Sequence, residues 1–132
     1  NGSILTSSDG ASWTAQTSNS TSELKAAGAL ISIVNNTTAY SYVAVGANGT
    51  VLSSSDAITW TPRSANTTAN LNHLSSSNQF VAVGTNGTVL TSIDGVAWTP
   101  QVSKTNAELR TIFKADNQLI VVDSSGNILS SK

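Results

Sequence analysis

Short apolar runs of four or five residues alternate along the chain with segments rich in Ser, Thr, Asn and Gly. The runs at 80–84 (FVAVG) and 88–92 (TVLTS) are rich in residues that favour strands, and Asn86-Gly87 between them favours a tight β-hairpin. The segments after Trp98 and at 109–115 predict further short strands. The pattern therefore predicts an all-β chain, with an amphipathic helix considered only at 22–31 (SELKAAGALI).

One phrase of the sequence recurs. NGTVLSSSDAITWTP at 48–62 is followed by NGTVLTSIDGVAWTP at 86–100, with a looser copy at 1–15 and a clipped copy, SGNILSSK, at 125–132. The tryptophans Trp13, Trp60 and Trp98 are 47 and 38 residues apart, and Asn86-Gly87 recurs as Ser125-Gly126 after 39 residues. The two shorter intervals set a period near 38 to 40 residues. A nine-residue insertion around 35–41 (NNTTAYS) explains the longer interval, and we expect it to lie in a loop.

A repeat of this length with four short antiparallel strands predicts the blade of a β-propeller. We expect a partial blade with its following loop at 1–23, blades at 24–62 and 63–100, and a partial blade of three strands at 101–132. A blade buries its apolar faces only against its neighbours, so Trp13, Trp60 and Trp98 are predicted to fill the gaps between blades. About three blades do not close a ring, so more chain or other subunits would have to complete it.

Each repeat also carries the motif Ser-x-Asp-Gly/Ala-x-x-Trp. The aspartate side chain can accept hydrogen bonds from nearby backbone N–H groups, and glycine can supply a left-handed backbone position. The predicted turn residues are Asp9, Asp56, Asp94, Gly10 and Gly95.

These motifs resemble the Asp-box, or BNR-like, repeat of sialidase-type propellers, although the usual Asp-box has one more residue between Asp and Gly. The longer phrase at 42–62 is similar to blades of bacterial propellers related to the photosynthetic assembly-factor group. The resemblance covers nearly the whole chain and implies a β-propeller fold. It also implies that the aspartates are structural turn residues and not catalytic acids.

Enzymatic activity finds little support in the sequence. Sialidases bind the carboxylate of their substrate with three arginines, whereas this chain has only Arg63 and Arg110. His73 is the single histidine and there is no cysteine, which leaves little for metal binding or nucleophilic catalysis. We expect a non-enzymatic protein with no catalytic, cofactor-binding or metal-binding residues, and a structural role for His73 on a strand.

Charged residues make up only 10% of the chain and the net charge is -1, so no basic field exists to attract nucleic acid. No apolar run approaches the length of a transmembrane helix. Low charge combined with abundant Ser, Thr and Asn is what we expect of an extracellular or cell-surface protein. The several Asn-x-Ser/Thr sequences, Asn1 among them, leave glycosylation open.

Three functions remain open. The first is a structural, adhesive or self-assembling scaffold, in which the terminal strand at 3–7 (SILTS) pairs with another chain or with the remainder of a longer propeller. The second is a glycan-binding propeller, and the third is an assembly factor. Candidate ligand or partner contacts lie in the loops between repeats and in the insertion: Arg63, Ser64, Asn66, Gln101, Lys104, Tyr40 and Tyr42.

Overall fold

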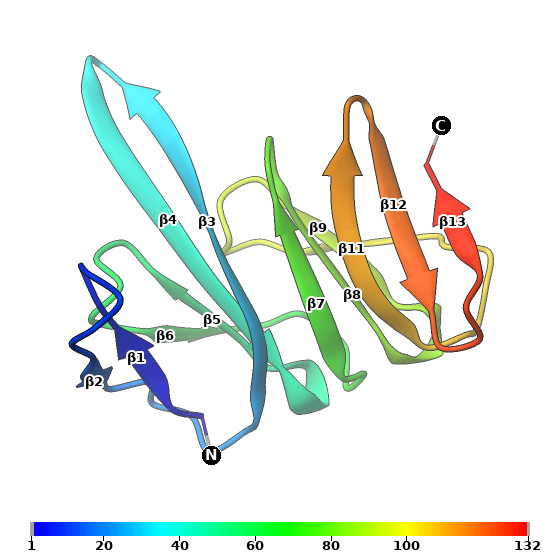
Figure 1. Cartoon of the computed structure of the whole chain (residues 1–132), viewed down its shortest axis with the longest axis horizontal. Helices are drawn as coiled ribbons and strands as arrows, with labels where there is room; N and C mark the ends of the chain where they lie inside the picture. Colours follow the sequence, from blue (N-terminus) through cyan, green and yellow to red (C-terminus); the bar gives the residue numbers. More distant parts are fainter. Residues whose placement is uncertain (1, 132) are drawn as a thin grey trace.

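The computed structural model describes residues 2–131 and consists of four antiparallel β-sheets placed side by side (Figure 1). Asn1 and Lys132 lie outside the described residues. The first two sheets contain β1 (Ile4–Thr6) and β2 (Thr14–Gln16), then β3 (Leu24–Val34), β4 (Thr37–Gly46), β5 (Val51–Ser54) and β6 (Thr61–Arg63). The other two contain β7 (Leu71–Ser76), β8 (Phe80–Gly84), β9 (Val89–Ser92) and β10 (Thr99–Gln101), then β11 (Leu109–Ala115), β12 (Gln118–Asp123) and β13 (Ile128–Ser130).

Each sheet is a simple meander in which consecutive strands are neighbours. The two complete sheets have the orders β3-β4-β5-β6 and β7-β8-β9-β10, while the outer sheets contain β1-β2 and β11-β12-β13. The prediction of four-stranded antiparallel propeller blades is confirmed, and the described sheets do not close a ring. Strands β6 and β10 each extend one residue past the blade ends expected at 62 and 100.

The Asn-Gly dipeptides form the tight turns between the second and third strands of both complete sheets. Short 3-10 turns cover Ala47–Gly49 and Thr85–Gly87. Asn48 has φ 55° and Gly49 has φ 67°, the left-handed region that Asn and Gly tolerate best. The Thr50 N–H donates to the Ala47 carbonyl at 3.0 Å and closes the turn.

In the region of the insertion, one alternative is excluded and one expectation is wrong. Residues 22–31 are not helical, because Leu24 to Val34 pair along β4, and burial alternates from Leu24 to Leu30 with the period of two that a strand requires. The insertion at 35–41 is not a loop but lengthens the β3–β4 hairpin, with its turn at Asn35 and Asn36. This hairpin projects well beyond the other strands (Figure 1).

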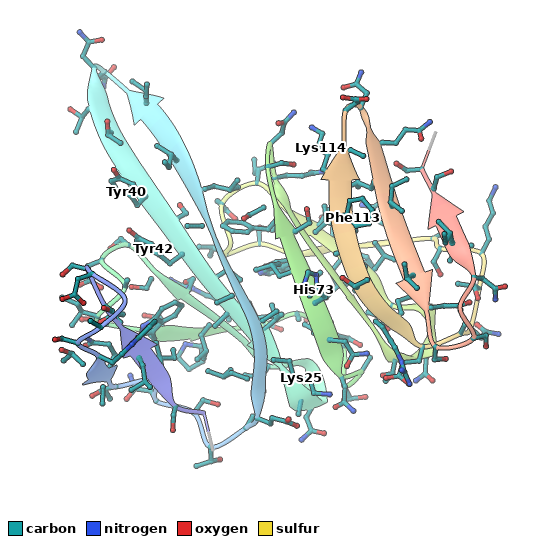
Figure 2. The ribbon with its side chains drawn as sticks, in the orientation of Figure 1. Lys25, Tyr40, Tyr42, His73, Phe113 and Lys114 are labelled. Carbon is teal, nitrogen blue, oxygen red and sulfur yellow. The ribbon has the colours of Figure 1, made fainter. Side chains whose placement is uncertain are left out.

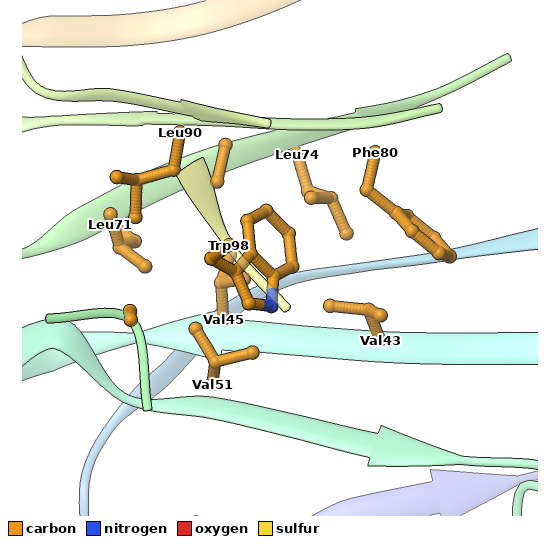
Figure 3. Packing of buried hydrophobic residues seen from close by; sticks show 10 residues of the cluster. Val43, Val45, Val51, Leu71, Leu74, Phe80, Leu90 and Trp98 are labelled. Carbon is orange, nitrogen blue, oxygen red and sulfur yellow. The ribbon is translucent and has the colours of Figure 1, made fainter. Parts of the chain in front are cut away.

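The hydrophobic core lies in three layers between successive sheets. The middle layer is the largest and joins Val43, Val45 and Val51 of one blade to Leu71, Leu74, Phe80 and Leu90 of the next, around the ring of Trp98 (Figure 3). The first layer surrounds Trp60 and the third layer surrounds Ile112. Each blade is therefore stabilised by its neighbours.

Candidate functional site

Four hydrogen bonds of the Ser-x-Asp turn recur in all three copies. In the second copy, one carboxylate oxygen of Asp56 accepts from the N–H groups of Ile58 and Thr59, both at 2.8 Å. The Ser54 hydroxyl donates to the same carboxylate at 2.9 Å and accepts from the Ala57 N–H at 2.9 Å. The turns containing Asp9 and Asp94 repeat this arrangement.

Backbone N–H groups lower the pKa of these three aspartates. The donors are Ser12 and Ala11 for Asp9, Thr59 and Ile58 for Asp56, and Val96 and Ala97 for Asp94. A carboxyl group that accepts several N–H bonds is stabilised in its ionised form. At neutral pH these aspartates therefore act as acceptors that organise the turn.

The turn also orients each tryptophan. The indole N–H groups of Trp13, Trp60 and Trp98 donate to the carbonyls of Gly10, Ala57 and Gly95 at 3.1 to 3.2 Å. Trp60 and Trp98 are only 4% and 6% exposed, whereas Trp13 is 59% exposed. The expectation that Trp13 lies in the blade core is wrong, because no sheet among residues 2–131 covers the outer face of β1 and β2.

The opposite end of the stack contains an open, mainly apolar cavity of about 430 Å³, with Gln79, Gln101 and hydroxyl side chains among its lining residues. It lies between the β7–β10 sheet and the β11–β13 sheet, in the third core layer. Val81 and Val89 line one side, and Ile112, Val121 and Leu129 line the other. This cavity is named the tryptophan slot below, because a tryptophan occupies the equivalent position in each of the other two core layers.

A polar groove of about 270 Å³ lies beside the β3–β6 sheet and the Asp94 turn. Arg63 and Asp94 line it, together with the hydroxyl-bearing residues Ser41, Ser54, Ser55, Thr59 and Thr61. Arg63 also donates from Nε to the Ser53 hydroxyl at 2.7 Å, which fixes its guanidinium beside β5.

The structure distributes the other predicted contact residues over several places. Gln101 and Lys104 line a shallow hollow of about 440 Å³ that is separate from the polar groove. Asn66 accepts a hydrogen bond from Ser64 at 2.9 Å within its own loop. Tyr40 lines the polar groove and stacks on Tyr42 with ring centroids 6.0 Å apart. Tyr42 also packs against the first core layer.

Side chains on the first strands of the two complete blades, β3 and β7, link each blade to the next, a role that the sequence alone did not predict. Lys25 donates to Asn72 at 3.1 Å, and Asn72 donates to the Leu109 carbonyl at 2.9 Å. His73 accepts from the Ile112 N–H at 3.3 Å, so it joins β7 to β11 (Figure 2). Their shared place in the repeat could have indicated this role, because Lys25, Asn72 and Arg110 each follow the first leucine of a repeat.

Two other kinds of site are absent from residues 2–131. No group of three or more His, Cys, Asp or Glu side chains is placed to hold a metal ion. No helix in this part of the chain has the length and apolar character needed to cross a membrane.

The repeated four-stranded sheets and the tryptophan-filled layers between them define a β-propeller domain. The family model of the DUF6242 beta propeller domain matches residues 7–132, and the chain belongs to this family. A search of curated proteins found no match to the chain.

Proposed function

We propose that this propeller domain is a non-enzymatic scaffold that works by self-association, at the cell surface or outside the cell. The observation that carries the proposal is that core positions are left open to solvent towards both ends of the stack. At one end Leu5 and Trp13 are more than half exposed, and at the other end the tryptophan slot is open. Apolar side chains left exposed at core positions of a folded domain are typical of association sites.

The surface chemistry supports the same proposal. Only 10% of residues are charged and the net charge is -1, so like-charge repulsion between copies is weak. The strands β1 and β13 each have an open edge that can accept a further strand. The location outside the cell is supported by this low charge and by the Ser, Thr and Asn content. We also infer that the Ser-x-Asp turns are shortened relatives of the Asp-box.

Sedimentation velocity of the 132-residue chain tests self-association. Over a range from low micromolar to about 100 µM, we expect the sedimentation coefficient to rise from that of a monomer to that of a discrete assembly. A folded chain that remains monomeric at every concentration would contradict the proposal.

Antibody labelling of intact and permeabilised source cells tests the location. Labelling only after permeabilisation would contradict a location at the cell surface or outside the cell.

A second candidate function is glycan binding in the polar groove. The specific observation is that a cation, a carboxylate and several hydroxyl groups line one groove, and such groups can hydrogen-bond to sugar hydroxyls. A glycan array tests this function, and the absence of any binder would count against it. Arg63→Gln should abolish binding to any hit, whereas the matched control Arg110→Gln, on β11, should not.

A further inference from the structure

We propose that the tryptophan slot receives Trp13 from a second copy of this chain. In this arrangement the β1–β2 hairpin of the second copy takes the place of β13 and completes a four-stranded blade with β11 and β12. The inference rests on the proposed self-association and names the contact that produces it.

The tryptophan slot is a copy of the middle core layer without its tryptophan. The register of the strands makes the apolar strand residues of the two layers equivalent, position by position, and Ala65 of the middle layer, outside the strands, is matched by Ser103. The equivalent pairs, with the middle layer first, are Val43 and Val81, Val45 and Val83, Val51 and Val89, Leu71 and Leu109, Leu74 and Ile112, Phe80 and Leu119, Ala82 and Val121, and Leu90 and Leu129. Trp98 has no counterpart in the third layer, and the open cavity of about 430 Å³ lies there.

The occupant is already present on the surface of the same chain. Trp13 is oriented as Trp98 is, because each indole N–H donates to a carbonyl three residues earlier at 3.2 Å. Leu5 holds the repeat position of Leu90, which packs beside Trp98 in the middle layer. The hairpin therefore presents both apolar groups in the arrangement that fills a layer, so binding requires little reordering of side chains.

Strand β1 can replace β13 because the two strands are versions of one repeat position. Ile4-Leu5-Thr6 corresponds to Ile128-Leu129-Ser130. In the structure Ser130 and Leu129 of β13 lie opposite Ile120 and Val121 of β12. If β1 of the second copy takes the same register, Thr6 lies opposite Ile120 and Leu5 lies opposite Val121. The exchange removes the three-residue strand β13 from the sheet and adds the strands β1 and β2 of the second copy. It also buries the indole ring of Trp13.

The exchange would also close the ring. Each copy supplies two complete blades and half of each of two shared blades, so two copies form a ring of about six blades. This number lies within the usual range of about four to eight. The partly buried Ile120 and Val122 of one copy would then face Trp60 and Leu52 of the other, as Val43 and Val45 face the next blade in the middle layer.

The first test compares two exposed apolar residues of equivalent turns. Trp13→Ala removes the proposed occupant, and Ile93→Ser is the matched control on a blade that is already complete. Trp13→Ala should weaken the association measured by sedimentation by about 30-fold or more, as expected for truncation of a central interface residue. Ile93→Ser should change it by less than about 3-fold. Circular dichroism verifies that both variants are folded.

The second test is covalent and does not depend on the stability of the tryptophan variant. The chain has no cysteine, so an introduced pair reports one contact. Thr6→Cys with Ile120→Cys should form an intermolecular disulfide under mild oxidation, because paired residues on adjacent antiparallel strands lie about 4.5 to 5.5 Å apart. The control pair Thr6→Cys with Val121→Cys is one residue out of register and should not form it.

The outcomes separate the inference from the proposed function. A wild-type chain that stays monomeric removes both. Association that is unchanged in Trp13→Ala, or cross-linking that is no greater for the registered pair than for the control pair, overturns the docking of Trp13 and leaves the scaffold function standing. Weakened association in Trp13→Ala together with the registered disulfide supports the composite blade.

Discussion

Gly10 and Gly95 hold the same position of the Ser-x-Asp turn in two repeats, and both have a positive φ, 75° and 77°. They differ in their surroundings. A Cβ atom at Gly95 would collide with Val43 and come within 3.3 Å of the ring of Phe80, whereas a Cβ at Gly10 would meet nothing within 4 Å. The same residue type therefore serves turn geometry alone in one repeat and turn geometry plus close packing in the other.

Alanine substitution should separate these two contributions. Gly10→Ala should lower the free energy of unfolding by about 1 kcal/mol, the cost of a left-handed alanine. Gly95→Ala should lower it by about 3 kcal/mol, because overpacking of the middle core layer is added. Urea unfolding measures both values, and equal losses would show that the contact with Val43 has no energetic role.

Acid should destabilise the fold through the turn aspartates. Hydrogen bonds from backbone N–H groups lower the pKa of Asp94 in the folded state below the ordinary value of 3.8. The ionised carboxylate therefore contributes stability that is complete above that value and is lost as the pH falls through the lower folded pKa. We expect the free energy of unfolding to be level near neutral pH and to decrease below about pH 4.

Asp94→Asn should make this decrease shallower, since one group that takes up a proton on unfolding has been removed. Asp116→Asn, in the exposed β11–β12 turn, is the matched control for the change of residue type. Urea unfolding at a series of pH values gives the slopes. A slope that is unchanged in Asp94→Asn, or changed equally in Asp116→Asn, would contradict the role assigned to Asp94.

At the scale of elements, the Ser-x-Asp turn and its tryptophan are buried or exposed depending on whether a neighbouring blade covers them. Trp98 is buried among the side chains of two blades (Figure 3) and packs at 6.4 Å between ring centroids against Phe80, whereas Trp13 is exposed. Trp98→Ala should cost about 3 to 5 kcal/mol of unfolding free energy. Trp13→Ala, measured where the chain is monomeric, should cost less than about 1 kcal/mol. Similar losses would mean that the interblade layer does not stabilise the fold.

The long β3–β4 hairpin contributes differently along its length. Its base packs on the core through Ala26 and Leu30, while Ile31, Ile33 and Tyr40 beyond it are exposed. Replacing residues 31–40 by Asn-Gly should give a hairpin within one residue of the length seen in the next blade and change the unfolding free energy by less than about 1 kcal/mol. A loss above about 3 kcal/mol in thermal or urea unfolding would show that the projecting part supports the blade.

At the scale of the whole molecule, association should depend little on salt. The chain has six Lys or Arg and seven Asp or Glu, and the surfaces proposed to meet are apolar. Screening weakens interactions between exposed charges but not apolar burial. Raising NaCl from about 50 mM to about 500 mM should change the dissociation constant measured by sedimentation by less than about 3-fold. A loss of association at high salt would point to charged contacts instead.

Much of the fold could be predicted because the repeat is local. Strand alternation, the Asn-Gly turns and the Ser-x-Asp turns each depend on a few consecutive residues, and their recurrence predicts the blade. The extension of the β3–β4 hairpin was missed because the pairing of Ile31 with Tyr40 is not visible in either segment alone. The link from His73 to the Ile112 N–H was missed for a similar reason, since the two residues are 39 apart in sequence.

The sequence by itself determined the repeat, the strands that compose a blade and the turn that orients each tryptophan, because these follow from backbone preferences over a short stretch of chain. Only the tertiary structure decided which tryptophans are buried, which blade interface is left open and which of the predicted contact residues share a groove. The physical reason is that burial depends on the neighbouring sheet: Trp13 and Trp98 have the same local motif, yet only Trp98 has a blade packed against it.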